Sequence, residues 1–377
     1  MSLTSDIKEF ALDLGYSRVG ITTADSFSEY AAIMQSRGAM YEFLVQDPAV
    51  WLEVSEPKKL MPSAKSIISL VWDYSQKAFP EGLLGKVGRL YLSRSYNAPP
   101  HRINGSRYQL MLDFVKKAGC QVGQGIFLPE RWAAARAGVT TYGRNNFAYA
   151  AGIGSFIVLS SIVVDAELEY DTPTVEVGCP EGCTACIKAC PTQAIYEPQK
   201  LNPRRCITLN TLFTQDGMPA GLSSHISPEI REKMGTWVHG CDVCQEVCPR
   251  NRERLQAKLP DDEFLVMASR DFSLTKMLNM TDEFYETRAQ PLMYNYIKER
   301  KYFQRNAAIA LGNLGDPAFI PDLEQAMNDP EKLVREYAAW ALGRIGGKLA
   351  KQVLETKRNL ETSENVQKEI EAALLAV

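Results

Sequence analysis

Cysteine spacing constrains this chain more than any other feature of its sequence. Eight of the nine cysteines lie between residues 179 and 249. They form two short runs that both end in Cys-Pro, with one cysteine between the runs: Cys179-x3-Cys183-x2-Cys186-x3-Cys190-Pro191, then Cys206, then Cys241-x2-Cys244-x3-Cys248-Pro249. This pattern is typical of a pair of [4Fe–4S] clusters, in which the last cysteine of each run binds the cluster of the other run.

The crossing of the last cysteines predicts two sets of four ligands. The first set is Cys179, Cys183, Cys186 and Cys248. The second set is Cys190, Cys206, Cys241 and Cys244, in which Cys206 supplies the ligand that the shorter run lacks. Cys179 fits the pattern least well, because three residues separate it from Cys183 where the ferredoxin run has two.

Two other interpretations of these cysteines remain open from the sequence. Two structural zinc sites would also use eight thiolates, but zinc ribbons have no reason to end both runs in Cys-Pro. A disulfide framework is typical of small secreted chains rather than of a chain of 377 residues. The ninth cysteine, Cys120, precedes an apolar run, and we expect it to be a small buried side chain rather than a nucleophile.

Length and charge set broad limits on the protein. A chain of 377 residues predicts two or three domains. The net charge of −3 gives no overall attraction for nucleic acid, so any polyanion must bind a local basic patch. The N-terminus lacks a basic and apolar leader, and no run of 18 apolar residues occurs. We therefore expect a cytoplasmic protein that does not bind a membrane.

Hydrophobic periodicity predicts alternating helices and strands before the cysteines. The expected helices cover residues 5–15, 108–118 and 130–137, and the expected strands cover residues 18–22, 66–73 and 156–164, with another strand beginning at 119. Glycines 152 and 154 precede the last strand. They either allow a backbone to approach a large flat ligand or simply form tight turns.

The C-terminal part of the chain contains a repeat. The segment Ala308–Gly315 recurs 31 residues later as Ala339–Gly346, and a degenerate third copy ends near Leu374. This pattern predicts a HEAT-like helical solenoid, in which each helix pair buries its apolar face against the next pair. Two or three repeats are too few to fold alone, so we expect them to pack on the preceding domains.

Taken together, these motifs resemble one enzyme family, the epoxyqueuosine reductases, along almost the whole chain. The strongest matches are Cys186-x3-Cys190-Pro191-Thr192-Gln193-Ala194-Ile195, Arg204-Arg205-Cys206-Ile207, Gly240–Pro249 and Arg305–Gly312. The resemblance implies an α+β multidomain fold: a nitroreductase-like α/β domain that binds cobalamin over residues 1–168, a ferredoxin-like domain with two clusters over 169–256, connecting helices over 257–300, and HEAT-like repeats over 301–377.

The resemblance also implies a reaction. Enzymes of this family use cobalamin and iron–sulfur clusters to reduce epoxyqueuosine to queuosine in tRNA, with electrons from a ferredoxin or flavodoxin. The implied proton donor is Glu130, at the position of the family's aspartate, and Tyr142 and Arg144 are further catalytic candidates. The candidate cofactor-binding residues are Gly143, Asn145, Gly154, Ser155, Asp165 and Thr208.

The sequence departs from the family where substrate is handled, and this leaves other functions open. The loop from Gly138 to Asn145 differs from the family's loop, and Arg250 replaces its tryptophan after the last Cys-Pro. One alternative is a corrinoid reductase of a small molecule that uses Tyr142 and Arg144. Another is an electron-transfer protein that reduces a partner. If tRNA is the substrate, the candidate phosphate contacts are Arg250, Arg252, Arg254, Lys298, Arg300, Lys301 and Arg305.

Overall fold

A computed structural model describes residues 2–42, 53–95, 102–123, 128–216, 223–293 and 297–377. The N-terminal part is built on a four-stranded sheet in the order β1-β2-β6-β3, and all its neighbouring strands are antiparallel. The strands are β1 (Arg18–Thr23), β2 (Ser66–Asp73), β3 (Val122–Gly123) and β6 (Ile157–Val164). The expected strand at 66–73 is present with those bounds, and the other expected strands are present within a few residues.

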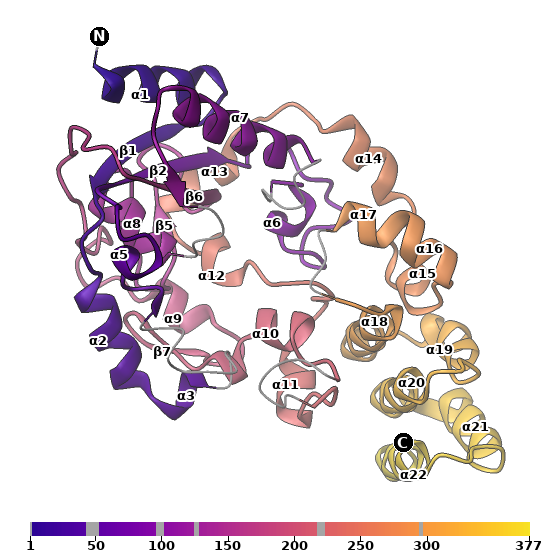
Figure 1. The fold of residues 1–377 in the computed structure, drawn as a ribbon. Coiled ribbons are helices and arrows are strands. Elements are labelled where there is room, and N and C mark those ends of the chain that lie inside the picture. Colours follow the sequence, from indigo (N-terminus) through magenta and orange to yellow (C-terminus); the bar gives the residue numbers. More distant parts are fainter. Residues whose placement is uncertain (1, 43–52, 96–101, 124–127, 217–222, 294–296) are drawn as a thin grey trace.

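Helices cover both faces of this sheet. On one face, α1 (Leu3–Asp13) and α7 (Ile103–Lys117) pack on Ile68 and Ile162. Both helices lie above the sheet in Figure 1. On the other face, α8 (Glu130–Arg136) packs on Ile67 and Val163. Successive side chains of a strand point to opposite faces, so two apolar layers require the nearly continuous apolar runs of β2 and β6. Cys120 is buried in the first layer, as expected.

A short hairpin joins the sheet to the cysteine segment. Its strands are β4 (Thr141–Tyr142) and β5 (Ala148–Tyr149). A tight turn follows, in which the backbones of Ala150 and Gly154 bond to each other in both directions. Gly154 has a φ of +86°, and a Cβ there would lie 2.2 Å from Asn251 Oδ1. The glycines thus form a turn that packs closely on the cysteine segment, which is the simpler of the two interpretations of the sequence.

The cysteine segment lies between the sheet and the C-terminal helices (Figure 1). It contains α9 (Ala185–Ala189), α10 (Ile207–Leu212), α11 (Pro228–Lys233), α12 (Val243–Glu246) and the two-stranded sheet of β7 (Ile195–Glu197) with β8 (Lys200–Leu201). Its apolar side chains join one large core with the repeats and with Leu83, Val87 and Leu92 from the N-terminal part. The parts of the chain therefore share cores across the expected domain boundaries.

The C-terminal repeat is the expected helical solenoid. Its helices are α18 (Arg300–Leu314), α19 (Ile320–Ala326), α20 (Lys332–Ile345), α21 (Gly347–Arg358) and α22 (Glu364–Ala376). The repeated glycines allow α18, α20 and α22 to pack closely. A Cβ on Gly312 would lie 2.9 Å from Ala341 Cα, and one on Gly343 would lie 2.8 Å from Ala373 Cα. Within the described residues, no helix has the length and apolar character needed to cross a membrane.

The described chain also contains further α-helices. In the N-terminal part they are α2 (Ser28–Arg37), α3 (Ala39–Glu42), α5 (Pro57–Leu60) and α6 (Arg89–Leu92). Between the cysteine segment and the repeats they are α13 (Arg252–Gln256), α14 (Glu263–Ser269), α15 (Leu274–Leu278), α16 (Asp282–Phe284) and α17 (Gln290–Leu292). In Figure 1 this second group arches from the sheet to the start of the solenoid, so the repeats are held by the preceding elements as well as by the shared core.

Candidate metal centre

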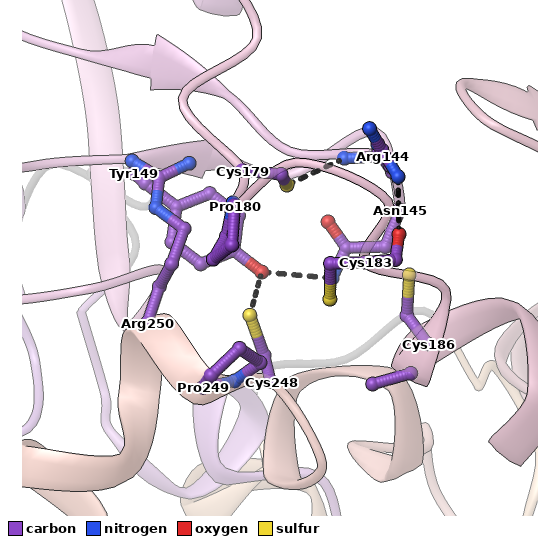
Figure 2. A pocket seen from close by; sticks show the side chains of 11 residues that line it. Arg144, Asn145, Tyr149, Cys179, Pro180, Cys183, Cys186, Cys248, Pro249 and Arg250 are labelled. Carbon is purple, nitrogen blue, oxygen red and sulfur yellow. Dashed lines mark hydrogen bonds between the residues drawn. The ribbon is translucent and has the colours of Figure 1, made fainter.

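Two separate cavities contain the two predicted sets of cysteines. Cys179 and Cys183 lie in the loop before α9, Cys186 lies in α9, and Cys248 follows α12. All four line one small cavity, which we call the first cavity. Figure 2 shows their sulfur atoms spread around the same space. Cys179, the weakest match in the sequence, therefore lies with its three predicted partners, and the role of all four as ligands stays a prediction.

The second set lines a larger cavity of about 190 Å³, which we call the second cavity. Cys190 ends α9 and Cys206 precedes α10, while Cys241 and Cys244 flank the start of α12. The contact between α9 and α12 brings the two cysteine runs together. That contact explains the crossing, because Cys190 and Cys248 each leave their own run for the cavity of the other.

Burial makes some cysteines of each set poor acids without a metal. It raises the pKa of Cys186 to about 11, with a further contribution from the neighbouring cysteines. It also raises the pKa of Cys241 and of Cys244 well above the ordinary value. Four thiolates crowded into one cavity repel one another, so they require a cationic body that removes their protons. The nine cysteines are free, which excludes the disulfide interpretation for this structure.

Asn145 connects the two cavities, since it lines both of them. Its Nδ2 donates hydrogen bonds to Tyr149 Oη at 2.9 Å and to the carbonyl of Cys244 at 3.1 Å. Thr208 also lines the second cavity. Two of the six candidate cofactor residues thus lie where a cofactor beside the second set would contact them.

The other cofactor candidates have different surroundings. Gly143 packs against Tyr149, and a Cβ there would lie 2.4 Å from Cε2 of that ring. The buried Ser155 hydroxyl donates to Gln245 Oε1 at 2.9 Å, and its amide donates to Asn251 Oδ1 at 2.9 Å, so Gly154 and Ser155 join the hairpin turn to the cysteine segment. Asp165 accepts a hydrogen bond from the Gln121 amide at the end of β6. Neither cavity is lined by these four residues.

The three catalytic candidates contact different elements. Glu130 Oε2 accepts a hydrogen bond of 2.6 Å from Ser161 on β6, and burial raises the pKa of this carboxyl to about 7. The ring of Tyr142 packs on Trp132, and its buried hydroxyl has no hydrogen-bond partner among the described residues.

Arg144 is bound to the first set of cysteines. Its guanidinium donates to the carbonyl of Cys183 at 2.5 Å, and its amide donates to Cys179 Sγ at 3.4 Å. The structure therefore places Arg144 at the first set and Glu130 on the sheet. It does not gather the three candidates around one reacting group.

Four residues that the sequence analysis did not assign to a cofactor also line the cavities. Tyr149 and Arg250 line the first cavity, while Arg131 and Asn146 line the second. The Nδ2 of Asn146 is buried without a hydrogen-bond partner in the described part of the chain, and this residue has a φ of +67°. Only the departure of Arg250 from the family pattern pointed toward this region.

Of the three histidines, two lie in described segments and neither lines a cavity that contains cysteines. His239 is fully buried between the rings of Tyr91 and Phe303, and burial lowers its pKa to about 3. His225 pairs with Glu336 in α20 at 3.0 Å. His101 lies outside the described residues.

Most of the candidate phosphate contacts are already paired within the protein. The prediction for Arg305 is wrong, because this side chain is fully buried and donates to the carbonyls of Thr214 and Ser224. Arg300 pairs with Asp282 and Asp329, Lys301 with Glu299, and Arg254 with Asp73. Arg250 is bound to Thr141 and Tyr142. Arg252 and Lys298 are exposed and form no ion pair with another described residue.

Comparison with known families supports two parts of this architecture. Residues 179–251 match the model of the 4Fe-4S double cluster binding domain, which favours iron–sulfur clusters over zinc in the cysteine segment. Residues 291–375 match the model of HEAT repeats.

Comparison with whole proteins finds relatives along nearly the full chain. The chain is 30% identical to epoxyqueuosine reductase of Staphylococcus aureus, covering 96% of this chain and 94% of the relative. It is 28% identical to epoxyqueuosine reductase of Bacillus subtilis, covering 99% and 95%.

Solved structures show the same likeness in three dimensions. A structure of the Bacillus subtilis enzyme, with its aspartate catalytic loop swung out of the active site, superposes with a TM-score of 0.83 at 28% identity and covers 100% of this chain and 99% of that chain. A structure of epoxyqueuosine reductase with an epoxyqueuosine-modified tRNA stem loop superposes with a TM-score of 0.82 at 27% identity, covering 99% and 98%.

Proposed function

The chain belongs to the epoxyqueuosine reductase family, and from this premise we propose that it reduces epoxyqueuosine to queuosine in tRNA. The observation that carries the proposal is the pair of cysteine sets, which line two adjoining cavities within a fold that matches the family along its length. A tRNA substrate also supports our expectation that the protein works in the cytoplasm.

The reaction requires electrons and protons that the proposed parts can provide. Removing the epoxide oxygen as water and leaving a double bond consumes two electrons and two protons. Each [4Fe–4S] cluster carries one electron at a time, so two clusters suit repeated single deliveries. We propose that a ferredoxin or flavodoxin supplies these electrons, as the resemblance implies.

We propose that a corrinoid binds next to the second cavity, beside the second set of cysteines. This cavity is lined by the apolar side chains of Phe147, Ile195 and Ile207 and also by Arg131 and Asn146. The unpaired amide of Asn146 is held in a left-handed backbone conformation, and strained residues with free polar groups are typical of ligand sites. A bound corrinoid supplies the cobalt-centred two-electron reduction that no side chain offers. Arg131, Asn146 and Thr208 would hold its polar edge.

The likeness of the N-terminal domain to the nitroreductase fold is part of the same proposal. A sheet covered by helices on both faces is compatible with it. The cofactor would then lie at the edge of this domain, where the hairpin of β4 and β5 meets the cysteine segment.

We propose Glu130 as the residue that holds the proton for the leaving oxygen. A pKa of about 7 keeps this carboxyl partly protonated at neutral pH, which suits a general acid. The next residue, Arg131, lines the second cavity. The variant Glu130→Gln should lose at least about 100-fold in turnover with its iron content unchanged. Retained turnover would assign Glu130 only a structural contact with Ser161.

The small-molecule alternative has less support, because its two candidate residues face inward. The Arg144 guanidinium is occupied by the carbonyl of Cys183, and the Tyr142 ring is buried against Trp132.

The direct test of the proposed function is nucleoside analysis of modified tRNA. Anaerobically purified protein should receive cobalamin, a one-electron donor and tRNA that carries epoxyqueuosine, and mass spectrometry should then detect queuosine. The cobalamin spectrum should change when the protein is added. If the spectrum changes without conversion, the protein is a corrinoid reductase of another substrate. If neither occurs, the electron-transfer interpretation replaces both.

A further inference from the structure

A tyrosine of the N-terminal domain hydrogen-bonds a predicted ligand of the first cluster. Tyr149 Oη donates to Cys248 Sγ at 3.2 Å and accepts a hydrogen bond of 2.9 Å from Asn145 Nδ2. The side chain is 2% exposed, so water does not compete for these bonds. Figure 2 shows the chain of bonds from Asn145 through Tyr149 to the Cys248 sulfur.

A positive charge is held against the same ring. The Arg250 guanidinium lies 4.0 Å from the centre of the Tyr149 ring and lines the first cavity. It is fixed there by hydrogen bonds of 2.5 Å to Thr141 Oγ1 and 3.2 Å to the carbonyl of Tyr142. Gly143 leaves room for the ring, because a Cβ there would overlap it. The arrangement is thus built by the hairpin of β4 and β5 together with the residue that follows Cys248-Pro249.

The second set of cysteines has a different environment. Cys190 Sγ accepts a hydrogen bond of 3.2 Å from the backbone amide of Ala194. Cys206 and Cys241 likewise interact with backbone groups of their own segment, at Leu209 and Val243. The hydroxyls that contact this set also come from its own segment, since Thr192 Oγ1 lies 3.7 Å from Cys190 Sγ and the Thr208 side chain bonds to Cys206. Among the described residues, Tyr149 of the N-terminal part bonds to a sulfur of the first set only.

Both features favour the reduced form of a cluster. Reduction takes the core of a [4Fe–4S] cluster from 2+ to 1+ by adding one electron, and no bond or proton changes. The added negative charge spreads onto the sulfur atoms, so a hydrogen-bond donor and a nearby cation stabilise the reduced form. We propose that Tyr149 and Arg250 raise the reduction potential of the first cluster and leave that of the second cluster unchanged. This inference rests on the two clusters and not on the identity of the substrate.

The test is a redox titration of the anaerobically purified protein with both clusters, using dithionite as the one-electron donor and monitored by absorbance and electron paramagnetic resonance. The wild-type protein should show two one-electron waves. In Tyr149→Phe and in Arg250→Gln, one wave should move to lower potential. The ratio of reduced to oxidised cluster at a fixed potential should fall about tenfold, which corresponds to about 59 mV for a one-electron couple.

Two matched variants separate this effect from general damage. Tyr16→Phe removes the hydroxyl of another buried tyrosine, which has no hydrogen-bond partner among the described residues. Arg252→Gln removes an equal charge two residues from Arg250, at an exposed position. Both controls should leave both waves in place.

The outcomes are distinct. Unchanged waves in Tyr149→Phe and Arg250→Gln overturn the proposal, and so does an equal shift of both waves. If Tyr149→Phe loses iron, Arg250→Gln decides, because that guanidinium has no hydrogen bond to a described cysteine sulfur. The titration needs no tRNA, so failure to reduce epoxyqueuosine leaves this result interpretable.

Discussion

At the scale of single residues, the carboxyl of Glu130 should make the stability of the protein depend on pH. Burial between α8 and β6 raises its pKa in the folded protein to about 7. The folded protein therefore binds more protons than the unfolded chain, and the stability contributed by protonated Glu130 is lost as the pH rises toward and through 7. From this carboxyl alone, the free energy of unfolding should fall by about 1 kcal/mol between pH 6 and pH 8.

Urea denaturation of the wild type and of Glu130→Gln at several pH values measures this effect. The difference in stability should move in favour of the Gln variant as the pH rises. A difference that stays constant from pH 6 to pH 8 would mean that Glu130 titrates normally in the folded protein.

The grouping of the cysteines could be predicted best from the sequence, and the residues that surround them could be predicted least. The spacing of a run fixes which thiols can reach one small body, so both sets could be grouped from the sequence alone. The contact of Tyr149 with Cys248 joins residues 99 positions apart, and no local pattern reports such a contact. The same holds for Ser155, whose partners Gln245 and Asn251 lie in another part of the chain.

At the scale of elements, α18 shows how a charged residue can mislead a sequence-based prediction. Arg305 follows three other basic residues and was expected at the surface, but the segment after α10 covers it. Its guanidinium donates to the carbonyls of Asn210, Thr214 and Ser224, which have no other described donor from this helix. Helical periodicity identifies which face is apolar, but it does not reveal that a polar loop packs on that face.

The variant Arg305→Ala should therefore destabilise the protein rather than weaken tRNA binding. It removes the donor from the buried carbonyls of Thr214 and Ser224 and opens a cavity, while the carbonyl of Asn210 keeps the Thr214 hydroxyl as a donor. The loss should cost about 3–5 kcal/mol of unfolding free energy. The matched control is Arg344→Ala, since Arg344 is 46% exposed and pairs with Glu232 at 3.7 Å; its loss should cost less than about 1 kcal/mol. Thermal unfolding of the two variants compares them. Similar midpoints would contradict the role of Arg305 as a buried connector of α18 and α10.

The repeated glycines are the opposite case, because their spacing in the sequence already indicates the repeated packing of helices. The motif Ala-Leu-Gly recurs because each glycine lies against the backbone of the next long helix, at Ala341 for Gly312 and at Ala373 for Gly343. Close helix packing thus has a signature at fixed spacing, which long-range hydrogen bonds lack.

At the scale of the whole molecule, binding of tRNA by a chain of net charge −3 must rely on few exposed cations. Arg252 and Lys298 remain available among the candidates. If each contacts a phosphate, Arg252→Ala and Lys298→Ala should each reduce the slope of log affinity against log salt by about 1. Lys351→Ala, an exposed position on α21 at the far end of the solenoid, is the control and should leave the slope unchanged. Fluorescence anisotropy with labelled tRNA measures the affinity of the three variants over a range of salt concentrations. If all three have the same slope, Arg252 and Lys298 do not contact phosphates.

The central claim is that electrons pass through both sets of cysteines to reduce epoxyqueuosine in tRNA. Its most direct test is conversion of modified tRNA by variants that disrupt one set at a time, with mass spectrometry of the nucleosides as the readout. Cys183→Ser should damage the first cluster and Cys241→Ser the second, while Cys120→Ser, in the core of the N-terminal sheet, should leave both intact. The account predicts that the first two variants lose conversion and that the third retains it. Conversion that persists after either set is disrupted would contradict the claim.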